Sequence, residues 1–165
     1  MLIELIKTAL TIPSGINGLV AGRGAYKATT QLKMDIAVLM RRGITKVNLV
    51  LSSATPDQRR KAFREFKKWS SKSNGGTPLR KFKINGCPPV HHVQQLFSLQ
   101  ADVAAALGTA GVYLDPKLRR KMLTLNNRLK DYQLSYAHHQ NTRFHYARCF
   151  ILRSKMKAIK FDTGF

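Results

Sequence analysis

Apolar side chains in the second half of the sequence recur at a spacing that fits one side of an α-helix. The steps between them are four, three, four, three and four residues, and the set is Leu118, Met122, Leu125, Leu129, Tyr132 and Tyr136. Because a helix turns once in about 3.6 residues, these side chains form a narrow apolar seam. Such a seam is typical of close packing against another helix, so the sequence predicts a mainly α fold.

A partner for the seam lies just before it in the chain. Residues 90–107 carry apolar side chains at helical spacing, and Gly108 follows as the expected C-cap. Asp115 followed by Pro116 is typical of a helix start. The short connection predicts that helices over 90–107 and 116–136 fold back on each other as an antiparallel hairpin.

Local signals predict further helices outside the hairpin. Apolar residues share one face over 26–42, and Gly43 is expected to end that helix. Thr55 and Gln58 have the spacing of a capping box at the start of another helix. Beyond Tyr136 the apolar pattern loses its register and then resumes, which predicts a separate last helix. We therefore expect four to five helices in all.

A minor β element is also expected. Residues 44–52 alternate apolar and polar side chains, and 79–84 do the same over a shorter run, so the two predict a two-stranded pair. The length suits a single domain over 1–165. Within it, residues 1–25 are expected to form a peripheral helix and a glycine-rich linker, and 137–165 a basic C-terminal segment.

Charge is the strongest indication of function. The chain has 29 Lys and Arg against 8 Asp and Glu, a formal net charge of +21. Solubility alone needs a net charge of only about 2–8 in a small domain. Such an excess indicates a polyanionic partner, and nucleic acids are the polyanions that cells hold in quantity. No stretch is apolar for the roughly 20 residues that a transmembrane helix needs, so no membrane span is expected.

The bases are concentrated in three regions, 59–83, 117–130 and 132–161, and the first and third of these also carry aromatic side chains. Ten bases and one acid lie between Arg59 and Lys83, and six bases and no acid between Tyr132 and Phe161. Bases contact phosphates, and aromatic rings that the core does not use can stack on unpaired bases. We expect Phe63, Phe66 and Trp69 to belong to the core, because their spacing is helical. The predicted phosphate-binding residues are Arg59, Arg60, Lys61, Arg64, Lys67, Lys68, Lys72, Arg80, Lys81, Lys83, Arg119, Arg120, Lys121, Arg143, Arg148, Arg153, Lys155 and Lys157.

The cysteines and histidines allow a more specific hypothesis, which is a zinc site. Cys87 with His91 or His92, and His145 with Cys149, could supply four ligands, and the second pair shares a helix face. The first pair, however, straddles two prolines, and the chain has no C-x2-C knuckle. We therefore favour buried free cysteines and exposed histidines, with no metal and no cofactor. Two cysteines also cannot provide a disulfide framework, which favours a reducing compartment.

An enzymatic role is not expected, because the eight acids are scattered singly and no nucleophile motif occurs. The sequence instead predicts a non-enzymatic, structural RNA-binding component of a large ribonucleoprotein such as a ribosome, with RNA favoured over DNA and other assembly proteins as partners. An intracellular location follows, in the cytoplasm or the mitochondrial matrix. Two alternatives stay open: a self-associating virion or nucleoid protein that coats a genome, and a basic protein bound to a membrane surface.

Overall fold

The computed structural model describes residues 18–71, 88–137 and 145–165, and the side chains from residue 29 onward except that of residue 71. The described part is helical, as the seam predicted, and contains no strand. The expected short N-terminal helix and the strand over 79–84 lie outside the described residues. The helices are α2 (Gly18–Ser52), α3 (Pro56–Ser71), α4 (Val90–Ala110), α5 (Pro116–Ala137) and α6 (His145–Thr163), with a 3-10 turn, η3 (Gly111–Tyr113), between α4 and α5.

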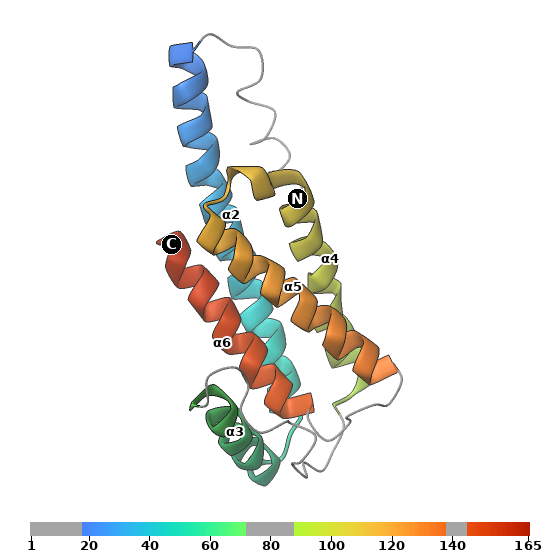
Figure 1. Cartoon of the computed structure of the whole chain (residues 1–165). Coiled ribbons are helices and arrows are strands. Elements are labelled where there is room, and N and C mark those ends of the chain that lie inside the picture. Colours follow the sequence, from blue (N-terminus) through green and yellow to red (C-terminus); the bar gives the residue numbers. More distant parts are fainter. Residues whose placement is uncertain (1–17, 72–87, 138–144) are drawn as a thin grey trace.

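Four of the helices form an antiparallel bundle. In Figure 1, α2 and α5 run in one direction, and α4 and α6 run in the other. Each of the four contacts two neighbours: α2 packs on α4 and α6, and α5 packs on the same two helices. The shorter α3 lies across one end of the bundle and packs against α6. Because α6 packs against α3 as well as against α2 and α5, this C-terminal helix joins α3 to the bundle.

The predicted helical hairpin is confirmed. Helices α4 and α5 run antiparallel, and their bounds differ from the predicted ones by three residues or fewer. Five of the seam residues, Leu118, Met122, Leu125, Leu129 and Tyr132, are at most 1% exposed. The helix α4 continues past Gly108 and is capped at Gly111 instead, so the C-cap predicted at Gly108 is wrong.

Two helix starts follow from local sequence. The backbone N–H of Thr55 donates to Oε1 of Gln58 at 2.9 Å, and the N–H of Gln58 donates to the Thr55 hydroxyl at 3.2 Å. This reciprocal pair is the predicted capping box, and it satisfies two backbone donors at the start of α3. At α5, the N–H of Leu118 donates to the Asp115 carboxylate at 2.8 Å, as an N-cap requires.

The β prediction for residues 44–52 is wrong, because these residues are the last part of α2. Their alternation includes Val47, Val50 and Leu51, which also share one side of a helix, and all three are buried. Packing of that side against the bundle outweighs the strand preference of the β-branched residues. The helix likewise begins at Gly18, so the part of the expected glycine-rich linker from Gly18 onward is helical.

Gly43 does not end a helix either, because it lies inside α2 at the closest approach of three helices. A Cβ placed on Gly43 would meet Cδ2 of Leu99 on α4 at 2.8 Å, and Sδ of Met156 on α6 at the same distance. Glycine is usually unfavourable inside a helix. Here its missing side chain lets α4 and α6 approach α2.

One polar contact crosses the interior of the hairpin. Gln100 interrupts the apolar face of α4, and its Nε2 donates to Oδ1 of Asn126 on α5 at 2.8 Å. Asn126 is 8% exposed, so the hydrogen bond satisfies a nearly buried amide oxygen. The pair fixes the register of α4 against α5.

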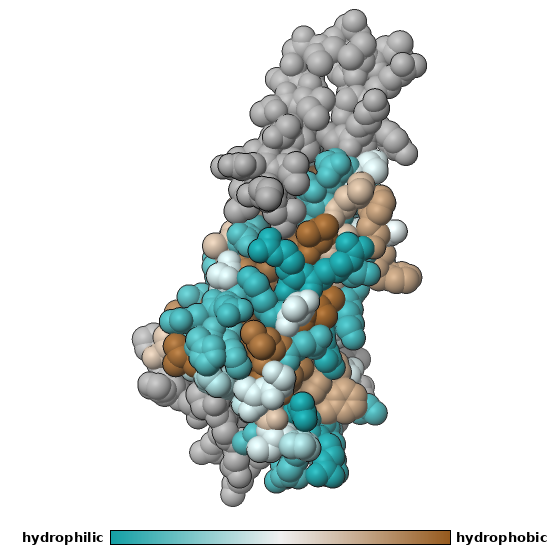
Figure 2. Space-filling view, turned by 180° about the vertical axis from the view of Figure 1, so that it is seen from behind, coloured by the Kyte–Doolittle hydropathy of each residue, from teal (hydrophilic) through white to brown (hydrophobic). Residues whose placement is uncertain are grey.

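The outer surface of the bundle is mixed in character. On the face seen from behind, hydrophilic side chains are interspersed with hydrophobic ones (Figure 2). Among the described helices, none is long and apolar enough to cross a membrane.

Candidate nucleic-acid interface

A second stripe of side chains runs along α5, one residue before each position of the apolar seam. It repeats the same steps of four and three residues and consists of Lys117, Lys121, Thr124, Arg128, Asp131 and Ser135. Because the seam faces the core, a stripe displaced by one residue lies at the edge of the α5 contact with α6. The stripe therefore places three bases along the groove between these helices, which we call the α5–α6 groove.

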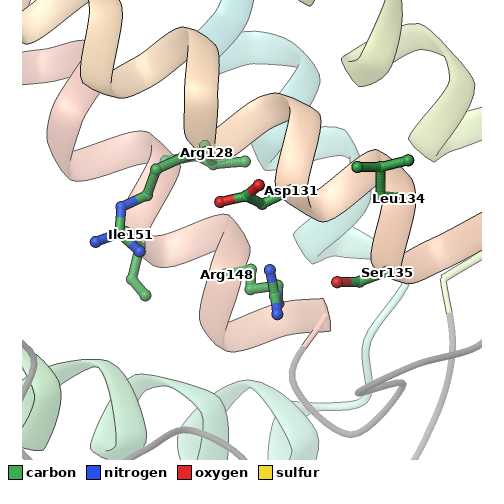
Figure 3. A pocket seen from close by; sticks show the side chains of 7 residues that line it. Arg128, Asp131, Leu134, Ser135, Arg148 and Ile151 are labelled. Carbon is green, nitrogen blue, oxygen red and sulfur yellow. The ribbon is translucent and has the colours of Figure 1, made fainter.

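Two hollows lie along this groove. The first, of about 380 Å³, is lined by Arg128, Asp131, Leu134 and Ser135 from α5 and by Arg148, Ile151 and Leu152 from α6. The second, of about 350 Å³, is lined by Lys117, Arg120, Lys121 and Thr124 from α5 and by Lys155 and Ala158 from α6. Figure 3 shows Arg128 and Asp131 of α5 and Arg148 of α6 around the first hollow. Both hollows thus combine basic side chains from the two helices.

Trp69 of α3 brings two of these bases together. The Arg128 guanidinium lies 5.0 Å from the centre of the Trp69 ring, and the Lys155 ammonium lies 5.7 Å from it. Both distances suit a cation–π interaction. The indole therefore attracts two cations that repel each other and holds them beside the groove.

The pKa shifts of Lys155 and Arg148 reflect the closeness of these like charges. Partial burial lowers the pKa of the Lys155 ammonium, and repulsion from Arg128 lowers it further. Burial is also the main cause that lowers the pKa of Arg148, with Arg128 acting in the same direction and Asp131 and Tyr132 opposing it. Within the described part of the chain, no ion pair involves Arg128, Arg148 or Lys155.

Arg148 has a further unsatisfied group. Its Nε is buried, and no hydrogen-bond partner reaches it among the described residues. Leaving a buried donor without an acceptor costs about 1–3 kcal/mol, and more for a charged group. An anion bound in the first hollow would lie beside the Arg148 side chain and neutralise the crowded charges.

The helix α3 supplies a second basic surface. Arg60, Lys61, Arg64, Lys67 and Lys68 are all exposed on it. Two of them are partly neutralised, because Lys61 pairs with Asp57 at 3.0 Å and Arg60 with the same carboxylate at 3.8 Å. Arg59 is half-buried at the first turn. None of these five exposed residues lines either of the two hollows of the α5–α6 groove.

The aromatic side of α3 faces α6. Phe63 and Phe66 lie against Phe150, with ring centres 5.3 Å and 6.1 Å apart, and Phe66 stacks on Trp69 at 6.4 Å. Phe66 packs against the core, as predicted, but Phe63 remains 38% exposed and Trp69 is half-buried. Trp69 thus lies between the core and the groove.

The remaining predicted bases have varied surroundings. Lys121 pairs with Asp162, and Arg153 donates to Asn48 at 2.9 Å while its guanidinium lies over Phe150. These two contacts connect helices, so both bases also have structural partners. Arg119, Arg120 and Lys157 are exposed. Outside the described residues lie Lys72, Arg80, Lys81, Lys83 and Arg143.

The zinc hypothesis receives no cluster of ligands from the described residues. Cys87 lies outside them, and His91 is exposed on α4 with its ring 4.1 Å from that of His92. His145 is buried, and its ring stacks on Tyr132 at 5.3 Å. Cys149 is fully buried, and burial raises its pKa to about 12, although a hydrogen bond with Tyr132 partly opposes this. In the described ranges, no three His, Cys, Asp or Glu side chains are grouped to hold a metal.

Sequence reasoning missed Arg128, which is the central base of the groove. Arg128 lies within the basic region 117–130, but only Arg119, Arg120 and Lys121 of that region are among the predicted phosphate-binding residues. The displaced stripe on α5 was the available signal. The contact of Arg128 with Trp69, in contrast, depends on how α3 packs on α6, so no local sequence pattern predicts it.

No family model, curated protein or solved structure matches the chain.

Proposed function

We propose that the protein is a non-enzymatic RNA-binding component of a large ribonucleoprotein assembly, and that the α5–α6 groove is its main phosphate-binding surface. The observation that carries the proposal is the meeting of Arg128, Arg148 and Lys155 without an ion pair between two described helices. Crowded, partly desolvated cations cost free energy in the free protein. Phosphates offset this cost and release condensed counterions on binding.

The arrangement of the bases supports a place within an assembly. Basic side chains lie on α3 as well as along the groove, and so they face more than one direction. A protein that reads duplex DNA usually presents one helix to the major groove. Several phosphate-binding surfaces suit a protein that lies among folded RNA segments.

The proposal is tested by RNA binding of the full chain across a salt series. Fluorescence anisotropy with a labelled structured RNA, measured between about 50 and 200 mM salt, should give a steeply negative dependence of log K on log salt. The double variant R128Q/K155Q should flatten that slope by about 1.4, since each lost phosphate contact contributes about 0.7 for single-stranded regions.

The matched control is K33Q/R42Q, which removes the same charge from α2 at positions that line neither hollow. It should leave the salt slope close to that of the unmodified protein. Equal effects of the two double variants would show that total charge, and not the groove, determines binding. Absence of RNA binding at 50 mM salt would overturn the proposed function.

A further inference from the structure

The first hollow of the α5–α6 groove contains more than a phosphate site requires. Arg128 and Arg148 lie on opposite helices around it, but Asp131 and Ser135 line it too. Its lining also includes apolar side chains, namely the exposed Leu134 of α5 and the largely covered Ile151 and Leu152 of α6. Asp131 favours the charged form of Arg148, and its carboxylate also offers acceptor oxygens that a phosphate cannot use.

The three kinds of lining suit the phosphate, the face of the base and the amino group of the base in a nucleotide. Guanidinium groups pair with phosphate oxygens, and the buried Nε of Arg148 lacks an acceptor among the described residues. Apolar side chains cover the face of a base. A carboxylate accepts hydrogen bonds from an exocyclic amino group, as Asp and Glu do with cytosine.

The size and position of the hollow favour an unpaired nucleotide. Ligand pockets of about 300 Å³ and above accommodate small molecules, and the first hollow measures about 380 Å³. It lies between the two packed helices α5 and α6. In a duplex the base edges and faces are already paired and stacked, so they cannot contact its apolar lining.

We propose that the first hollow binds one unpaired nucleotide of single-stranded nucleic acid, with its phosphate between Arg128 and Arg148 and its base amino group donating to Asp131. This inference rests on the proposed function and specifies what the groove recognises. Trp69 acts as a positioning residue, because its ring holds Arg128 at the edge of the hollow. The adjoining second hollow, which is lined by Lys155, receives the next part of the strand.

The test compares single-stranded and duplex probes on the full chain. The probes are 12-nucleotide oligo(C), 12-nucleotide oligo(U) and, as the duplex probe, an RNA hairpin with the same number of phosphates whose loop is replaced by a non-nucleotide linker. The unmodified protein should bind oligo(C) about tenfold more tightly than the hairpin, which is the order of one favourable base contact. It should also prefer oligo(C) to oligo(U), because uracil has no amino group.

The variant S135F fills the hollow without changing any charge. Its matched control is Q133F, which adds the same ring to an exposed position of α5 outside the hollow. S135F should bind oligo(C) and the hairpin with affinities within about twofold of each other, whereas Q133F should keep the tenfold preference. Salt slopes should stay steep in both variants.

If S135F folds poorly, the variant D131A provides an independent test of the nucleotide pocket. D131A removes an exposed carboxylate, so it should strengthen binding of oligo(U) and abolish the preference for oligo(C). Equal binding of all three probes by the unmodified protein, together with a steep salt slope, would overturn the nucleotide pocket and leave the proposed function standing. Absence of binding to any probe at 50 mM salt would overturn the proposed function itself.

Discussion

Gly43 of α2 lies directly against Met156 of α6, so that a Cβ on Gly43 would come within 2.8 Å of the Met156 sulfur. Both Met156 and the third participant, Leu99, are at most 1% exposed and have little space to move. We therefore expect G43A to lower the free energy of unfolding by about 1–2 kcal/mol, because the overpacking cost of about 1–3 kcal/mol exceeds the gain of about 0.5–1 kcal/mol in helix propensity. Urea denaturation followed by circular dichroism measures the loss.

Gly108 provides the control for this substitution. It lies inside α4, and an added Cβ would meet nothing within 4 Å. G108A should therefore stabilise the protein, by about 0.5–1 kcal/mol, through the better helix propensity of alanine. Opposite signs for the two variants are the expected result, and a stabilising G43A would contradict the packing described here.

The effects of substituting Gln100 and Asn126 on the free energy of unfolding should be strongly coupled, because a hydrogen bond joins the two side chains. Q100L alone removes the donor and leaves the Asn126 amide oxygen nearly buried without it, at a cost of about 1–3 kcal/mol. The double variant Q100L/N126L replaces both partners by apolar groups and should recover much of that loss. A double-mutant cycle in urea measures the coupling, and strictly additive effects would rule it out.

Asp35 should make the stability depend on pH. It is 3% exposed on α2, and burial raises its pKa, although a hydrogen bond from Gln31 at 3.0 Å partly opposes this. The folded state therefore disfavours the ionised carboxylate, and stability falls as pH rises from the unfolded pKa of about 3.9 through the higher folded value.

The substitution D35N removes this penalty. It should raise the free energy of unfolding at pH 7, and its advantage should shrink as the pH falls toward about 4. Denaturation curves at both pH values measure the difference. An advantage of D35N that is the same at both pH values would exclude Asp35 as the source.

Cys149 should be chemically inert in the folded protein. Its thiol is fully buried, and its pKa of about 12 leaves it protonated at neutral pH. In a C87S background, Ellman's reagent at pH 8 should leave Cys149 unmodified over minutes and should react with it promptly in concentrated urea. Prompt reaction under native conditions would show that the α5–α6 contact opens readily.

The fold could be predicted where a short stretch of sequence specifies both a helix and the side on which that helix packs. The seam from Leu118 to Tyr136 determines both the α5 helix and the need for a partner, so the hairpin followed from the pattern. The capping box at Thr55 is equally local and was correct. Residues 44–52 were misassigned because alternation over nine residues fits a strand as well as one side of a helix, and only packing on α4 and α6 decides between them.

The candidate site could be predicted only in part. Net charge predicts a polyanionic partner, and the predicted phosphate-binding residues Arg148 and Lys155 both line the groove. The contact between Arg128 and Trp69 could not be predicted, because it forms only when α5 and α3, which are distant in the sequence, come together in the fold. Arg153 and Lys121, in turn, were expected to contact phosphates, but each already has a partner on another helix.

The position of Trp69 has a practical consequence for measurement. It is the only tryptophan in the chain, and its ring lies under two cations that line the groove. The emission of an indole responds to charges and rings beside it, so the protein contains a natural optical reporter at the groove. Occupancy of the groove can thus be followed in the unlabelled protein, as a change in the colour and intensity of its own fluorescence.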